Sequence, residues 1–108
     1  LLGGALLLAG CGRERTARFV DPLDAAVADP GRPAAERARD AWRRPLETLR
    51  FFGLQPGQSV AEFWPGAGYL TAILAPFAQL TDGRLIAAQV DPALAPANAQ
   101  LLTRYRQR

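Results

Sequence analysis

Histidine, lysine and methionine are all missing from this sequence of 108 residues, which has a single cysteine, Cys11. With one cysteine, the chain cannot form an internal disulfide. Without histidine, it can build neither a cysteine–histidine catalytic pair nor a histidine-ligated metal site, and we predict no metal. All 13 basic residues are arginines, yet the net charge is only +3 because ten acidic residues are interspersed among them. Such mixed charge is typical of a solvated surface, so we predict no nucleic-acid partner.

The first eleven residues, LLGGALLLAGC, form an apolar run that ends in small residues and Cys11. The run is shorter than the ~20 apolar residues that a membrane-spanning helix needs, and it fits the apolar part of a secretion signal. Its end, LAGC, resembles the bacterial lipobox, in which the signal is cleaved before the cysteine and the cysteine is lipidated. The resemblance implies an exported, periplasmic protein with a lipid anchor, and Gly12 after the cysteine implies the outer membrane. A buried helix that ends in a free cysteine is the alternative.

Residues 12–33 predict a linker between this anchor and a folded domain. The first part is charged and aperiodic, and the second, DPLDAAVADPGRP, holds three prolines and the turn signal DPGRP. We therefore expect the folded domain to span residues 34–108.

The domain should begin with two helices. Residues 34–44 are rich in helix formers, Pro45 should kink or restart the helix, and Gly53 should end it at a C′ position. The residues at helical spacing that predict one apolar face are Ala38, Trp42, Leu46, Leu49 and Phe52.

The other face of these helices is charged. Asp40 and Arg44 are four residues apart, as are Arg43 and Glu47, so we expect these charges to pair locally. Packing on a sheet is the simplest role for the helix pair; a substrate-facing role for Trp42 or Arg50 is the alternative.

Two apolar segments, residues 59–64 and 85–90, predict strands, and the first is apolar enough to be covered on both faces, as in a parallel sheet. Helical spacing follows each of them, over residues 69–75 before Pro76, which should end or bend the helix, and over residues 95–108. The order helix–strand–helix–strand–helix is the signature of an α/β fold with a parallel sheet.

The turn after the first strand, WPGAG at residues 64–68, is a candidate ligand loop. A strand that passes through a glycine turn into a helix directs backbone N–H groups at one point, which attracts an anionic or polar group. Gly66 and Gly68 permit positive φ angles and close backbone approach. Glu62, an acid on an otherwise apolar strand, needs a partner, and a ligand amino group is one candidate.

Two polar residues follow the second strand. Gln89 and Asp91 lie 21 and 23 residues beyond Gly68, in the window where dinucleotide-binding folds place an acid that binds the ribose hydroxyls.

The stretch VAEFWPGAG, residues 60–68, resembles motif I of class I S-adenosylmethionine-dependent methyltransferases, an acid followed by Gly-x-Gly-x-Gly. Glu62 matches the acid, Gly66 and Gly68 match the second and third glycines, and Trp64 replaces the first. With its flanks, LETLRFFGLQPGQSVAEFWPGAGYLTAILAP, it resembles a bacterial subgroup of exported methyltransferases whose loop reads as a Trp-Pro-Gly variant. The resemblance covers about residues 25–92.

This resemblance implies a Rossmann-like three-layer sandwich with a parallel sheet and S-adenosylmethionine as the cofactor. In that family the glycine loop approaches the methionine part of the cofactor, and the acid after the second strand holds the ribose. Gln89 stands where that acid most often falls, and Asp91 is the alternative. The implied cofactor-binding residues are Glu62, Trp64, Pro65, Gly66, Ala67, Gly68, Gln89 and Asp91. The sequence identifies no catalytic residue.

A complete domain of this family needs about 160 residues, so we expect residues 34–108 to be its N-terminal part, with the first two strands. Two other functions stay open. An exported protein has no obvious supply of a cofactor made inside the cell, which leaves a degenerate, non-enzymatic binding protein. The pattern GAGYLT, residues 66–71, is also compatible with another kind of nucleotide-binding domain as the function. A P-loop is excluded because no Gly-Lys-Ser/Thr follows.

We predict that the mature protein begins at a lipidated Cys11. Mass spectrometry of the mature amino terminus should find a lipid-modified cysteine, because LLLAGC is followed by a polar tether. An unmodified Cys11 that is still preceded by residues 8–10 would contradict this prediction.

Overall fold

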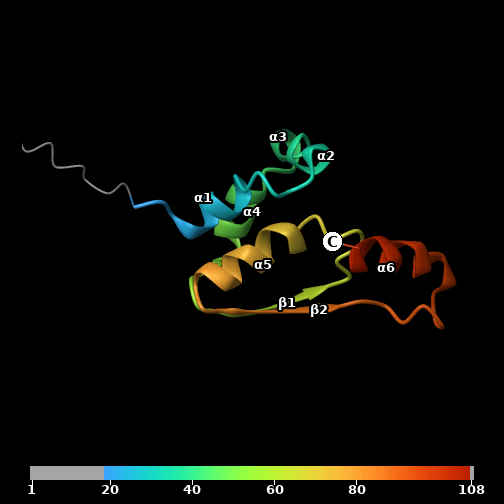
Figure 1. Cartoon of the computed structure of the whole chain (residues 1–108). Coiled ribbons are helices and arrows are strands. Elements are labelled where there is room, and N and C mark those ends of the chain that lie inside the picture. Colours follow the sequence, from blue (N-terminus) through green and yellow to red (C-terminus); the bar gives the residue numbers. More distant parts are fainter. Residues whose placement is uncertain (1–18, 108) are drawn as a thin grey trace, which may run out of the picture.

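The computed structural model describes residues 19–107, which form a mixed α/β fold (Figure 1). The elements in chain order are α1 (Pro22–Val27), α2 (Ala34–Arg37), α3 (Asp40–Arg43), α4 (Pro45–Phe51), β1 (Ser59–Phe63), α5 (Thr71–Leu80), β2 (Arg84–Ala88), the 3-10 helix η1 (Pro96–Asn98) and α6 (Ala99–Arg106). β1 and β2 pair in parallel, with Val60 opposite Leu85. The predicted α/β class and parallel pairing are therefore confirmed. Within this described part, no helix is long and apolar enough to cross a membrane.

The core lies around α5, which packs on one side against the sheet and on the other against α1 (Figure 1). The apolar residues of α5 recur at helical spacing, and Ile73 in its first turn is fully buried. The buried cluster contains Leu23, Ala26, Leu49, Tyr69, Ile73, Leu74 and Phe77. Because α1 and α4 contribute to this cluster, the N-terminal helices are part of the core.

The expected linker is wrong over residues 22–33. Asp21 caps α1 by accepting hydrogen bonds from the backbone N–H groups of Leu23 and Asp24, and Pro22 occupies the first turn. Leu23 and Ala26, one turn apart, enter the core. A proline in the first helical turn loses no hydrogen bond, so here Asp-Pro starts a helix instead of breaking one.

The helical region before β1 breaks at Arg44, which adopts a left-handed conformation with φ 47°. Pro45 disfavours the α conformation at the preceding residue, and α4 restarts with Pro45 in its first turn. The break ends the predicted continuous apolar face, because Trp42 is 67% and Phe52 75% exposed, whereas Leu49 is buried. The exposure of Ala38 at the end of α2 agrees with this correction.

Gly53 ends α4 as predicted. It has φ 77°, its N–H bonds the Arg50 carbonyl at 3.0 Å, and the N–H of Leu54 bonds the Leu49 carbonyl at 3.1 Å. These two bonds form a Schellman motif, which requires a residue of positive φ at C′.

The sheet is covered on one face only, so the prediction that both faces of the first strand are covered is wrong for the described residues. Glu62 and Val60 point toward α5, whereas Phe63 is 80% and Ile86 of β2 is 52% exposed. The strands also end earlier than predicted, and α5 continues through Pro76 to Leu80.

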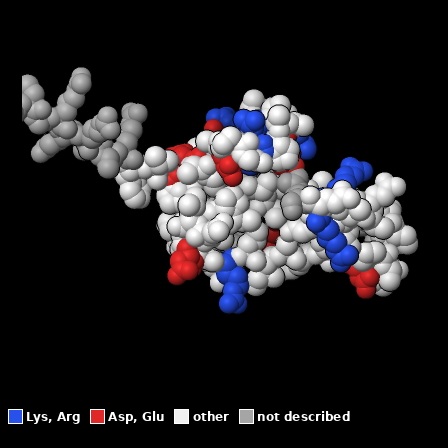
Figure 2. Space-filling view, viewed as in Figure 1, with Lys and Arg blue, Asp and Glu red and all other residues white. Residues whose placement is uncertain are grey.

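Charges are interspersed on the face seen in Figure 2, where basic and acidic side chains lie among neutral ones. The local pairs expected from four-residue spacing are wrong. Asp40 pairs with Arg32 from the loop after α1, and Glu47 pairs with Arg44 at 3.1 Å, three residues away. The break at Arg44 changes which charges face each other.

An ion pair between a buried arginine and a partly exposed aspartate joins the loop after α1 to α3 and, through Tyr69, to the turn before α5. The Arg32 guanidinium, 1% exposed, donates to both carboxylate oxygens of Asp40 at 2.8 and 2.9 Å, and to the Val27 carbonyl. The Tyr69 hydroxyl, just before α5, donates to the same carboxylate. The hydrogen bond from Arg32 holds the pKa of Asp40 below its ordinary value of 3.8, and burial raises the pKa of Tyr69.

We predict that Asp40→Asn lowers the free energy of unfolding at pH 7 by about 2–3 kcal/mol, since it leaves the buried Arg32 charge uncompensated. The folded-state pKa of Asp40 is depressed, so its stabilisation is present above the ordinary pKa of 3.8 and is lost as pH falls through the folded value. Denaturant unfolding at several pH values should show that the free energy of unfolding falls less for the variant than for the wild type as the solution becomes acidic.

The control is Glu47→Gln, which removes an exposed ion pair in the same helical region. Exposed pairs contribute little, so this variant should unfold nearly like the wild type at pH 7. Equal destabilisation by the two substitutions would contradict a special role for the buried pair.

Candidate functional site

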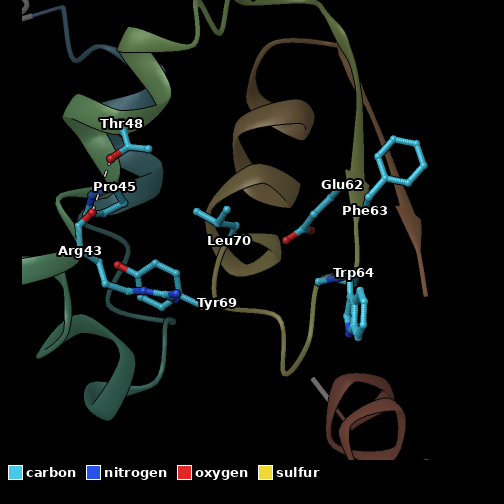
Figure 3. A pocket seen from close by; sticks show the side chains of 9 residues that line it. Arg43, Pro45, Thr48, Glu62, Phe63, Trp64, Tyr69 and Leu70 are labelled. Carbon is cyan, nitrogen blue, oxygen red and sulfur yellow. Dashed lines mark hydrogen bonds between the residues drawn. The ribbon is translucent and has the colours of Figure 1, made fainter. Parts of the chain in front are cut away.

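A cleft of about 310 Å³ lies at the carboxyl end of β1, between the loop that follows this strand and the junction of α3 and α4 (Figure 3). The residues that line it are Arg43, Pro45, Thr48, Glu62, Phe63, Trp64, Pro65, Tyr69 and Leu70. The cleft is thus built from three parts of the chain: the strand with its loop, the turn before α5, and the break between α3 and α4.

The loop WPGAG, which we name the glycine loop (residues 64–68), has three residues of positive φ: Trp64 at 57°, Gly66 at 60° and Gly68 at 90°. The Trp64 N–H bonds the Ala88 carbonyl at 2.9 Å, which fixes the start of the loop to the end of β2. The Gly68 N–H bonds the Pro65 carbonyl at 2.9 Å and closes the turn. The loop therefore needs glycine for its backbone, as the sequence predicted.

The space at Gly66 is open. A Cβ atom built on this residue meets no heavy atom within 4 Å. A clash with the rest of the protein therefore does not explain why this residue is glycine. The φ angle of 60° explains it, and the open space would also let a ligand approach the backbone.

Glu62 is buried, with 8% of its surface exposed, and its carboxylate faces α5. The hydroxyl of Thr71, the first residue of α5, donates to Glu62 Oε2 at 2.6 Å. The acid thus joins the two ends of the glycine loop. We expected a ligand amine as a candidate partner, and the structure supplies a threonine from the same chain; a carboxylate can accept further hydrogen bonds.

The structure brings Gln89 to the glycine loop and leaves Asp91 outside it. Gln89 Nε2 donates to the Gly66 carbonyl at 3.2 Å. Asp91 is exposed, and its carboxylate accepts a hydrogen bond from the Ala93 N–H at 2.9 Å in the turn after β2. Of the two alternatives after the second strand, Gln89 is therefore the residue next to the loop.

The other predicted residues divide between the cleft and the loop backbone. Glu62, Trp64 and Pro65 line the cleft, whereas Gly66, Ala67 and Gly68 do not. Cys11 lies outside the described residues.

Arg43 and Tyr69 are cleft residues that the sequence did not single out as binding residues. The Arg43 guanidinium lies 4.4 Å from the centroid of the Tyr69 ring, a cation–π contact. The Arg-Arg-Pro sequence was the one signal that could have identified Arg43. Pro45 breaks the helix after Arg43, and Arg44 then pairs with Glu47, which was the expected partner of Arg43.

The alternative substrate-facing residues, Trp42 and Arg50, do not line this cleft. Arg50 pairs with Asp24 at 3.2 Å, which ties α4 to α1. A second cleft, of about 490 Å³, lies between α5 and the loop after α1, where Arg32 and Pro33 face Ala72 and Gln79. None of the residues of the glycine loop line this second cleft.

Comparison with known proteins does not assign the chain to a family. No family model matches it, and no curated protein or solved structure shows significant similarity to it.

The left-handed conformation of Trp64 leads to a prediction about strain. A residue with a Cβ costs about 1 kcal/mol more than glycine at such a φ angle. We expect Trp64→Gly to have a free energy of unfolding about 1 kcal/mol higher than that of Trp64→Ala, because both lose the indole and only glycine removes the strain. Thermal and denaturant unfolding of the two variants test this, and equal stabilities would show that the backbone here is unstrained.

Proposed function

We propose that this protein is an S-adenosylmethionine-dependent methyltransferase-like protein in which α1, which shares their core, and residues 34–108 together form the N-terminal, cofactor-binding part of a Rossmann-like domain. We also propose that it is exported to the periplasm and anchored through a lipidated Cys11. The observation that carries the cofactor proposal is the glycine loop, which follows the first of two parallel strands and has positive φ at Trp64, Gly66 and Gly68.

The geometry of the loop supports a ligand at this edge of the sheet. In parallel α/β folds, ligands bind outside the carboxyl ends of the strands, and both β1 and β2 end beside this loop. The open space at Gly66 allows a ligand to approach the backbone. Gln89, held on the loop through its Nε2, has a second polar atom, Oε1, that suits a ribose hydroxyl.

The size of the cleft suits one part of the cofactor, so a second region must hold the rest. A volume of about 310 Å³ is at the lower end of the range for small-molecule pockets, roughly 300–1,000 Å³. It fits the methionine part, while Gln89, which contacts the loop but does not line this cleft, suits the ribose. Methyl transfer relies largely on positioning, so the function does not require a general base in this part of the chain.

A non-enzymatic binding protein of the same fold is the second candidate. It is favoured by the Glu62–Thr71 hydrogen bond, because an acid that holds the loop closed serves the fold even without a cofactor. Binding of S-adenosylmethionine to the full-length protein separates the two candidates, because only the methyltransferase-like protein requires it.

We predict that Gly66→Ala weakens S-adenosylmethionine binding to the full-length protein by about 1–3 kcal/mol, through a Cβ placed in the ligand's path. Gly53→Ala is the matched control: Gly53 also has positive φ and an open space around its Cβ position, but it ends α4. Calorimetry and thermal unfolding should show similar destabilisation in both variants and weaker binding in Gly66→Ala alone.

Glu62→Gln provides a second check, because it keeps the shape of the side chain and removes its charge. It should weaken binding if the carboxylate contributes to the site. A folded wild-type protein that shows no S-adenosylmethionine binding contradicts the proposed function and leaves the non-enzymatic binding protein as the better candidate.

A further inference from the structure

The cleft carries opposite charges on opposite walls. Glu62 reaches it from the end of β1, and Arg43 reaches it from the end of α3 (Figure 3). The carboxylate is buried, whereas Arg43 is exposed to solvent. A ligand in this cleft would meet an acid on one side and a cation on the other.

The charge of Arg43 is not neutralised by a carboxylate among the described residues. Its neighbours along the chain are already engaged, since Asp40 pairs with Arg32 and Glu47 pairs with Arg44. What holds Arg43 is the face of the Tyr69 ring, 4.4 Å from the guanidinium carbon. A stacked guanidinium keeps its N–H edge available for hydrogen bonds.

Tyr69 is itself held in place. Its hydroxyl donates to Asp40, whose carboxylate is bound by the buried Arg32, and its ring is 7% exposed. The platform under Arg43 is therefore ordered before any ligand arrives. Such preorganisation reduces the conformational entropy that binding would otherwise lose.

We propose that Arg43 is the residue that selects ligands with a free carboxylate in this cleft, and that the ligand's amino-acid end lies between Arg43 and Glu62. This inference rests on the proposed function, and it names the part of S-adenosylmethionine that the cleft takes. A guanidinium binds a carboxylate through two parallel N–H···O bonds, and an ammonium group on the same carbon is complementary to the acid on the opposite wall.

The test compares two ligands that differ only in the carboxylate: S-adenosylmethionine and decarboxylated S-adenosylmethionine. Calorimetry on the full-length wild type should show at least about tenfold tighter binding of the first, as expected for a charge-assisted hydrogen bond. Arg43→Gln should lose most of this preference and bind the decarboxylated compound as the wild type does.

Arg39→Gln is the matched control. The Arg39 guanidinium also lies over the Tyr69 ring, at 5.5 Å, and Arg39 is exposed, but it does not line the cleft. This variant should keep the wild-type preference. Thermal unfolding of both variants checks that they are equally folded.

Three results overturn the inference while the proposed function stands: a wild type that binds both ligands equally, an Arg43→Gln variant that keeps the preference, or one that weakens both ligands by the same factor. A folded wild type that binds neither ligand contradicts the proposed function itself, and the inference with it.

Discussion

The buried ion pair between Arg32 and Asp40 is the contact on which the arrangement of the N-terminal helices depends. Helices as short as α2 and α3, of four residues each, have almost no stability of their own. Their place is fixed by the bidentate bond from Arg32, which also bonds the carbonyl at the end of α1. The Arg32 Nε atom is buried without a hydrogen-bond partner, so the fold accepts one unsatisfied donor to keep this junction.

This junction connects the core to the candidate site through Tyr69. The residue directly follows the glycine loop, and its hydroxyl bonds the Asp40 carboxylate while its ring supports Arg43. At the other end of the loop, Glu62 bonds Thr71. The loop is therefore fixed at both ends by polar contacts, and the space beside Gly66 stays open to a ligand.

Sequence patterns predicted the parts of this molecule that follow from local rules. The Gly53 cap, the two parallel strands and the positive-φ glycines at 66 and 68 each depend on a few neighbouring residues. The errors arise where the determining contact is distant. The linker prediction failed because Leu23 is buried by α5, about 50 residues later, and the local charge pairs failed because Asp40 binds Arg32 across a loop.

The candidate site was also predicted only in part, because some of its contacts depend on residues that are distant in the sequence. Gln89 was a candidate because of its spacing from Gly68, and the structure brings its Nε2 to 3.2 Å from the Gly66 carbonyl. Arg43 was missed as a binding residue because its position depends on the left-handed break at Arg44 and on stacking with Tyr69. Neither contact leaves a periodic pattern in the sequence. Whether these residues bind a cofactor remains a proposal, and the comparisons with known proteins do not assign one.

The position of α1 in the core changes how far the domain can stand from a membrane. A tether that ended at residue 33 would allow at most about 75 Å between Cys11 and the domain, at roughly 3.4 Å per residue. Because the folded part already begins at the Asp21 cap of α1, the chain takes only ten steps from Cys11 to Asp21, and the limit falls to about 35 Å. With the proposed anchor at Cys11, the start of α1 would remain within about 35 Å of the lipid surface, less than half the distance that a tether ending at residue 33 would allow.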